Sequence, residues 1–205
     1  MAKKVTVLFA GGFKPLHAGH VDLINKYANN PDVNEIKIFV SPSTRGFINQ
    51  DTSFKVINFL INNPKICIEK VEHSSPISSA CKFIESAKPG KYAIASSTKG
   101  NDHNRIKYLV NYYKTHKTPK GVKLVELNID NVALVYKGRN DKFEGTPISA
   151  SVLRQDIQNA DFNNFKTNYQ NYSFDVINTI WNLINDQILY YKDTKFDNVP
   201  KKMAN

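Results

Sequence analysis

The chain has 205 residues, of which 41% are hydrophobic and 22% are charged, and its formal net charge is +10. These values are typical of one globular domain, and no hydrophobic run approaches the about 20 residues that a membrane helix needs. They exclude a membrane-spanning protein, and because no apolar signal region precedes the first expected strand we expect a cytoplasmic chain.

The positive charge raises the possibility of a polyanionic partner. However, the lysines are dispersed along the chain, and no basic stretch is interleaved with aromatic residues as in a single-strand platform. We therefore interpret the charge as support for a site that binds phosphate groups, without choosing among polyanions, although a nucleic acid is the less expected partner.

The first expected elements are a strand, a tight turn and a helix. Residues 5–9 are β-branched, aromatic or aliphatic, Gly11 and Gly12 interrupt this run, and residues 17–28 can form a helix. Two glycines let the backbone approach a bulky anion, and the start of the helix offers unpaired N–H groups. The pattern predicts a phosphate site at this turn.

His17 and His20 are three residues apart, with small Ala18 and Gly19 between them. On a helix this spacing places both imidazoles on one face, where each can donate a hydrogen bond to an oxyanion. Two alternatives remain at this point. The histidines could be a pair of metal ligands, although no carboxylate or cysteine cluster lies beside them, or they could be ordinary surface histidines. We expect no metal site built by the protein's side chains.

A second strand is expected at residues 35–40, which gives a βαβ unit and hence a parallel sheet. Ligands of such sheets bind beyond the carboxyl ends of the strands. The loop 41–49 would lie there and carries Arg45, whose guanidinium matches the geometry of a phosphate. A solvated surface arginine is the alternative.

The middle of the chain predicts further alternation of helices and strands. We expect Thr52 and Ser53 to cap the next helix, and Cys67 and Cys81 to be buried, reduced packing residues. The expected elements are helix 54–61, strand 65–71, helix 78–87, strand 91–95, helix 106–113, and strands 123–129 and 132–136.

Two polar loops could border the site. The loop 96–105 follows an expected strand and carries Lys99 and Arg105, which we take as candidates for phosphate binding. A surface turn explains the same residues. The loop 137–145 is either a mobile loop over the site or ordinary surface structure.

The segment Thr146 to Arg154 predicts a second anion site. A serine at a helix start caps the helix and leaves N–H groups for an anion, and Arg154, one turn on, would point toward the same place. A well-capped surface helix is the alternative. Farther on, residues 174–190 are expected to form an amphipathic helix that packs against the core or against a second subunit. A homo-oligomer is therefore one possibility. We expect one domain, residues 1–191, and a polar tail, residues 192–205.

Residues 12–20, Gly-Phe-Lys-Pro-Leu-His-Ala-Gly-His, resemble the GxFxPxHxGH signature of the HxGH nucleotidyltransferase superfamily. Residues 146–154 resemble its second signature, ISxTxxR or ISSS, with Ser151 at the position where many members have threonine or serine. The resemblance implies a Rossmann-like α/β fold with a parallel sheet and helices on both faces. It also implies roles for individual residues: catalysis for His17, His20, Lys14 and Arg154; nucleotide binding for Gly11, Gly12, Phe13, Gly19, Ser149 and Ser151; and phosphate or acceptor binding for Arg45, Lys99 and Arg105.

The implied reaction transfers a nucleotidyl group from a nucleoside triphosphate to a phosphorylated acceptor and releases pyrophosphate, with Mg²⁺ bound by the phosphates. The closing Arg154 resembles the adenylyl branch, which favours ATP and nicotinamide mononucleotide as acceptor. Thr146 and Ile148 echo the cytidylyl branch, so CTP with a sugar or alcohol phosphate is the alternative. A nucleotide-binding or nucleic-acid-binding protein without turnover is the alternative of another class. Class I aminoacyl-tRNA synthetases share HxGH, but the chain is short for them and has no KMSKS-like loop.

Overall fold

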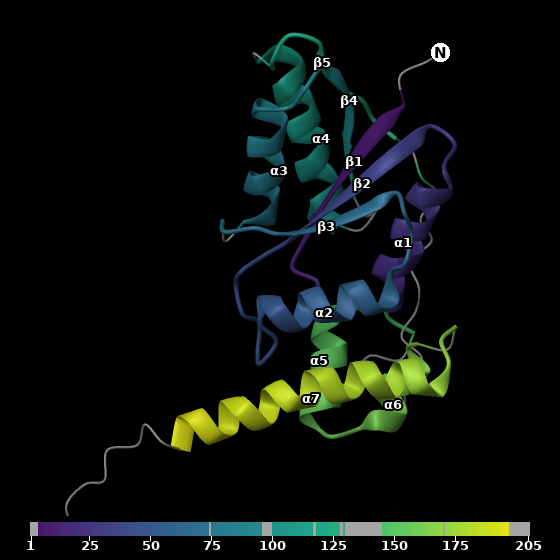
Figure 1. Ribbon diagram of the computed structural model, residues 1–205, viewed down its shortest axis with the longest axis vertical. Helices are drawn as coiled ribbons and strands as arrows, with labels where there is room; N and C mark the ends of the chain where they lie inside the picture. Colours follow the sequence, from purple (N-terminus) through teal and green to yellow (C-terminus); the bar gives the residue numbers. More distant parts are fainter. Residues whose placement is uncertain are drawn as a thin grey trace, which may run out of the picture.

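The computed structural model describes residues 4–73, 75–95, 100–116, 118–127, 129, 145–169 and 171–196. In this part of the chain, a parallel five-stranded sheet with the strand order β3-β2-β1-β4-β5 is covered by helices on both faces (Figure 1). The elements are β1 (Val5–Gly11), α1 (Ala18–Asn29), β2 (Val33–Val40), α2 (Gln50–Leu60), β3 (Ile66–Lys70), α3 (Pro76–Glu85), β4 (Gly90–Ile94), α4 (Gly100–Thr115), β5 (Val122–Leu124), α5 (Ala150–Gln158), α6 (Phe162–Thr167) and α7 (Phe174–Phe196). The expected α/β fold is confirmed.

The central strands are continuous hydrophobic runs because helices cover both of their faces. Val7 and Leu8 of β1 are fully buried although they point to opposite faces of the sheet. β1 pairs in parallel with β2 over its whole length, from Val5 with Val33 to Gly11 with Val40. The carboxyl ends of these two strands therefore lie side by side.

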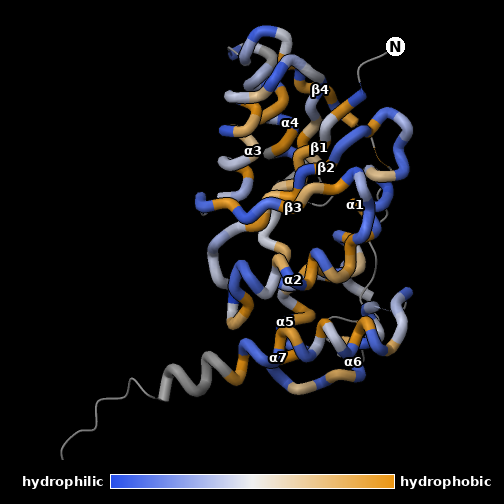
Figure 2. The backbone as a smooth tube through the Cα atoms, in the orientation of Figure 1, coloured by the Kyte–Doolittle hydropathy of each residue, from blue (hydrophilic) through white to orange (hydrophobic). Residues whose placement is uncertain are grey.

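Two hydrophobic clusters fill the space between the sheet and the helices. One joins β1 and β2 to α1, α2 and the C-terminal helices α5, α6 and α7. The other joins β1, β2 and β4 to α3 and α4. α3 and α4 lie together on one side of the sheet, whereas α5, α6 and α7 gather beyond α2 (Figure 1). The tube of α7 alternates between hydrophobic and hydrophilic colours, as expected for an amphipathic helix that packs on one face (Figure 2).

The predicted cap of α2 was wrong. The helix begins at Gln50, and Asn49 caps it by accepting a hydrogen bond from the Thr52 backbone N–H at 2.9 Å. Thr52 and Ser53 lie inside the helix and are buried. The Asn49 side chain also donates to Gln187 of α7 at 2.6 Å, so one residue both starts α2 and fastens it to the C-terminal helix.

Several expected boundaries differ from those of the structure. Residues 100–105, expected as part of a loop, form the first turns of α4, and β5 is shorter than the expected strand 123–129. α6 was not predicted, and α7 continues to Phe196, so the first five residues of the expected polar tail, 192–196, are helical. The expected strand 132–136 lies outside the described residues, as do residues 197–205.

The prediction that both cysteines are buried was wrong for Cys67, which is exposed. It lies on β3, an outermost strand of the described sheet, where only one neighbouring strand is paired. Cys81 on α3 is half-buried and packs against the second hydrophobic cluster. Among the described residues, no helix combines the length and the hydrophobicity needed to cross a membrane.

Candidate functional site

The candidate site lies at the carboxyl ends of β1 and β2. The strand order places β1 between β2 and β4, so the chain moves from β1 to one side of the sheet and later returns to the other. Ligands bind at such a switch point, because the loops on either side diverge there. The segment 12–17, which follows β1, is at this point, and the loop 41–49 follows β2 beside it.

Phe13 occupies the turn in an uncommon conformation, with a φ angle of 49°. Its ring stacks on Phe9 with 5.4 Å between the ring centroids, and it meets the ring of His20 edge-on at 5.3 Å. A Cβ on Gly11 would lie 2.6 Å from the Phe13 ring. Gly11 therefore makes room for a buried phenylalanine, and nucleotide binding by these two residues remains a prediction.

His17 and His20 form the centre of the site. α1 begins at Ala18 with His17 as its N-cap residue, and the His17 side chain does not cap the helix itself. The two imidazole rings stack with 3.7 Å between their centroids. His17 is buried, whereas His20 is half-buried. The expected placement of both imidazoles on one side of the helix start is confirmed.

Tyr169 fixes the chain immediately before His17. Its ring is fully buried, and its hydroxyl donates a hydrogen bond of 2.5 Å to the Leu16 carbonyl oxygen. Burial in a nonpolar environment raises the pKa of this phenol. The hydroxyl therefore remains a donor at neutral pH, and the segment after α6 supports the histidine pair.

The second signature lies beside the first. Ser149 caps α5 and accepts a hydrogen bond from the Val152 backbone N–H at 3.4 Å, while its hydroxyl is 2.9 Å from that of Ser151. A Cβ on Gly19 would lie 3.2 Å from the His17 ring and 3.2 Å from a methyl group of Ile148. Glycine at this position lets α1 and the segment before α5 approach closely.

Lys14 is placed differently from our expectation that its ammonium binds phosphate oxygens. Its side chain is only 1% exposed, and Nζ donates a hydrogen bond of 2.7 Å to the Ser41 carbonyl oxygen. Burial, and secondarily the positive charge of Arg45, lower the pKa of Lys14 to about 8. Lys14 therefore joins the loops that follow β1 and β2.

Arg45 and Arg154 both reach the turn after β1. The Arg45 side chain is exposed, and a Cβ on Gly12 would lie 3.7 Å from its Nε atom. Arg154 donates from Nη1 to the Lys14 carbonyl oxygen, and its side chain passes over Gly46. Burial, and secondarily the charge of Arg45, lower the pKa of Arg154.

Three cations, Lys14, Arg45 and Arg154, meet at this turn, and none of them belongs to an ion pair in the described part of the chain. The charge that acts on Lys14 and Arg154 is the like charge of Arg45. Like charges repel one another, so a bound anion would stabilise the arrangement. The arrangement therefore suits phosphate groups.

No family model and no curated protein matches the chain. Among solved structures it is similar to the nicotinic acid mononucleotide adenylyltransferase of Plasmodium falciparum complexed with APC, at 14% identity and a TM-score of 0.45, over 92% of this chain and 96% of that one. It is also similar to a bifunctional NMN adenylyltransferase/ADP ribose pyrophosphatase of Francisella tularensis complexed with AMP and an Mn ion, at 15% identity and a TM-score of 0.45, over 98% of this chain and 58% of that one. At this level of similarity, function has to be inferred from this chain's own residues.

Two expected phosphate contacts are not brought into the site by the described structure. Lys99 lies outside the described residues, as do residues 137–144. Arg105 lies in α4 rather than in a loop, and its side chain is outside the described part. Both remain predictions.

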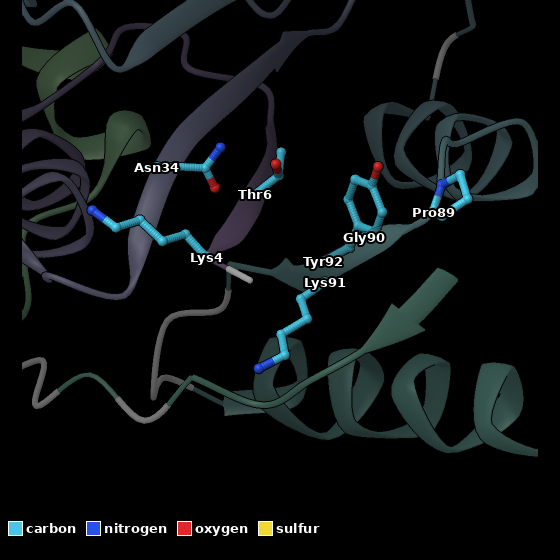
Figure 3. A pocket seen from close by; sticks show the side chains of 7 residues that line it. All are labelled: Lys4, Thr6, Asn34, Pro89, Gly90, Lys91 and Tyr92. Atoms are coloured by element: carbon cyan, nitrogen blue, oxygen red, sulfur yellow. The ribbon is translucent and has the colours of Figure 1, made fainter. Parts of the chain in front are cut away.

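A hollow of about 310 Å³ lies at the opposite edge of the sheet, where β1, β2 and β4 begin (Figure 3). Lys4 and Lys91 line it, but their ammonium groups point away from each other, and the Asn34 amide lies between β1 and β2 near Thr6 (Figure 3). This hollow is separate from the loops that carry both signatures.

Sequence reasoning missed three residues that shape the site. Ser41 provides the carbonyl that holds Lys14, and Tyr169 supports Leu16. Gly46 has a φ angle of 65°, which favours glycine, and a Cβ there would lie 3.3 Å from Arg154. The glycine that follows Arg45 was a visible turn signal, but a contact between residues 153 positions apart, as for Tyr169, leaves no local pattern.

Proposed function

We propose that this chain is a nucleotidyltransferase that transfers an adenylyl group from ATP to a phosphorylated acceptor, with nicotinamide mononucleotide as the first acceptor to test. The observation that carries the proposal is that Lys14, Arg45 and Arg154 meet at the turn that leads into the stacked pair His17 and His20, and that no ion pair in the described residues includes them. Such a site suits a ligand with several phosphate groups.

In the proposed reaction, an oxygen of the acceptor's phosphate attacks the α-phosphorus of the triphosphate. The bond from the α-phosphorus to the oxygen that bridges to the β-phosphorus breaks, and pyrophosphate leaves with that electron pair. No enzyme nucleophile is needed, so catalysis comes from positioning and from charge stabilisation. N–H groups of His17 and His20 would donate hydrogen bonds to the α-phosphate oxygens as negative charge develops on them.

The other residues divide between the two ends of the triphosphate. Arg45, above Gly12, is exposed and can contact a phosphate directly. Arg154, with Ser149 and Ser151 at the start of α5, would hold the leaving pyrophosphate. Lys14 would contribute its charge without touching the phosphates, because its ammonium is buried where it donates to the Ser41 carbonyl.

Magnesium is part of the proposal as an ion that arrives with the substrate. The described residues contain no group of three histidine, cysteine or acidic side chains that could hold a metal. Mg²⁺ usually keeps several waters and binds substrate phosphates, where it neutralises part of their charge. The site fits this arrangement, since its own side chains near the phosphates are cations and hydrogen-bond donors.

The choice of ATP over CTP rests on the second signature. The closing Arg154 is similar to the adenylyl form of that signature, and it reaches the Lys14 carbonyl in the structure. Thr146 and Ile148 are similar to the cytidylyl form, and Ile148 packs close to Gly19. CTP with a sugar or alcohol phosphate therefore remains the second candidate pair of substrates.

The test is pyrophosphate release by the full chain with Mg²⁺. ATP and CTP are each combined with nicotinamide mononucleotide, nicotinic acid mononucleotide, phosphopantetheine, a sugar phosphate and an amino-alcohol phosphate. We expect release that requires one nucleotide together with one acceptor, and that stops when Mg²⁺ is chelated. Release that requires CTP would overturn the choice of ATP. No release with any pair, while ATP and CTP still bind, would favour a nucleotide-binding protein without turnover.

A further inference from the structure

We propose that Lys14 is a positioning residue that fastens the loop 41–49 to the turn after β1 and so holds Arg45 above Gly12. The inference rests on the proposed function only in taking a phosphate as the group that Arg45 contacts. The statement that one buried lysine holds the loop 41–49 in place can be tested without any ligand.

The first link is the Lys14 side chain itself. Nζ donates to the Ser41 carbonyl oxygen at 2.7 Å, and both residues are buried, with 1% and 3% of their surfaces exposed. Ser41 is the first residue after β2, so this bond fixes the loop where it leaves the sheet. A hydrogen bond from a charged donor in a buried place is stronger than a neutral one.

The second link closes the loop on itself. The backbone N–H of Arg45 donates to the Ile48 carbonyl oxygen at 3.1 Å, and the N–H of Ile48 donates to the Arg45 carbonyl oxygen at 3.2 Å. Ile48 is fully buried in the hydrophobic core. With Ser41 and Ile48 both held, the exposed Arg45 side chain is directed back over Gly12.

The third link returns to Lys14. Gly46, next to Arg45, packs against the Arg154 side chain, because a Cβ there would lie 3.3 Å from Cδ. Arg154 in turn donates to the Lys14 carbonyl oxygen. The three links form a closed ring through three segments of the chain, and Lys14 takes part in it with both its side chain and its backbone.

The charges around Lys14 explain why this ring would respond to a phosphate. Arg45 from the loop and Arg154 from α5 are the charged groups that the described structure brings to it, and both are cations. Burial and Arg45 lower the pKa of Lys14 to about 8. A bound anion would raise that pKa, so by linkage the affinity for triphosphate is expected to fall as pH rises through about 8.

The experiment compares Lys14→Met with Lys88→Met by hydrogen exchange of the ligand-free full chain. Methionine keeps most of the volume but cannot donate to Ser41. We expect the amides of Arg45 and Ile48 to exchange about ten-fold faster or more in the Lys14 variant, with the sheet unchanged. The exposed Lys88, before β4 at the opposite edge, should have no effect when replaced. Unchanged exchange in the loop of a folded Lys14→Met protein would overturn the proposal.

A measurement on the unaltered protein covers the case in which Lys14→Met does not fold. Protection factors for the loop 41–49 are measured at pH 7 and at pH 9.5, with intrinsic exchange rates divided out. They are expected to fall together once Lys14 is neutral, because a neutral amine forms a weaker hydrogen bond than an ammonium. Constant protection across the pH range in which NMR shows Lys14 to lose its proton would contradict the proposal.

Affinity for a non-hydrolysable ATP analogue then separates this inference from the proposed function. Faster loop exchange together with weaker binding supports both. Faster loop exchange in a chain whose parent does not bind the analogue supports the role of Lys14 and rejects the proposed function. If Lys14→Met binds less tightly while loop exchange is unchanged, Lys14 touches the ligand directly and the positioning role is wrong.

Discussion

Replacement of His20 by alanine is expected to lower kcat for nucleotidyl transfer by about 100- to 1,000-fold, the usual effect of removing one donor to a developing oxyanion. His20 is half-buried, stacks on His17 at 3.7 Å and meets the Phe13 ring edge-on. Its imidazole is held in place before any ligand binds, so its hydrogen bond would be available without reorganisation. Initial rates of pyrophosphate release at saturating substrate measure the effect.

The matched control is His116→Ala. His116 follows α4, is exposed, and stacks on Tyr112 at 3.7 Å, so it also loses a ring contact when replaced. Its removal should leave kcat within two-fold of the parent value, a margin set by the small effects usual for surface substitutions. Equal loss of activity in both variants, or none in His20→Ala, would show that the histidine pair does not act on the reacting phosphate.

Arg154→Ala is expected to lower kcat/KM by about 100-fold and also to destabilise the fold. The guanidinium provides a charge to the site, and it donates to the Lys14 carbonyl oxygen. Loss of this hydrogen bond from a charged donor, which leaves the Lys14 carbonyl without it, is expected to lower the free energy of unfolding by about 1.5 to 3 kcal/mol. Steady-state kinetics and urea unfolding measure the two effects separately.

Two further variants define what Arg154 contributes. Arg154→Lys keeps the charge but not the planar guanidinium. Compared with Arg154→Ala, it should therefore recover part of kcat/KM but little of the free energy of unfolding. Gln158→Ala, at the exposed end of the same helix, should change neither. If Arg154→Ala loses stability but retains kcat/KM, the arginine is a structural link and does not hold the pyrophosphate.

The sequence predicted the local structure of the first half of the candidate site well, because the elements of that half are neighbours in the chain. The strand, the glycine turn and the start of the next helix follow one another within residues 5–20, and each leaves a pattern of its own. Only the resemblance predicted that the second signature lies close to the first. In the structure it depends on the small Gly19 and on the bond from Arg154 to Lys14, two residues that are 140 positions apart.

The contact that the Lys14 side chain makes could not be predicted in the same way. A lysine in a phosphate-binding turn suggests a direct contact, and only the tertiary structure shows that its ammonium lies on the Ser41 carbonyl. Phe13 is a similar case, since its ring packs over Gly11 and into the core. The cap of α2 was misplaced because Asn49, Thr52 and Ser53 are all residues that can cap a helix, and burial decided among them.

The most direct test of the central claim is the fate of the α-phosphate. The full chain is incubated with Mg²⁺, the acceptor identified by pyrophosphate release, and ATP labelled with ³²P at either the α or the γ position. The account predicts that the α label joins the acceptor in a product with a new phosphate–phosphate linkage, while the γ label leaves in pyrophosphate. Release of the γ label as inorganic phosphate, or its transfer to the acceptor, would contradict nucleotidyl transfer and indicate chemistry at the γ-phosphate instead.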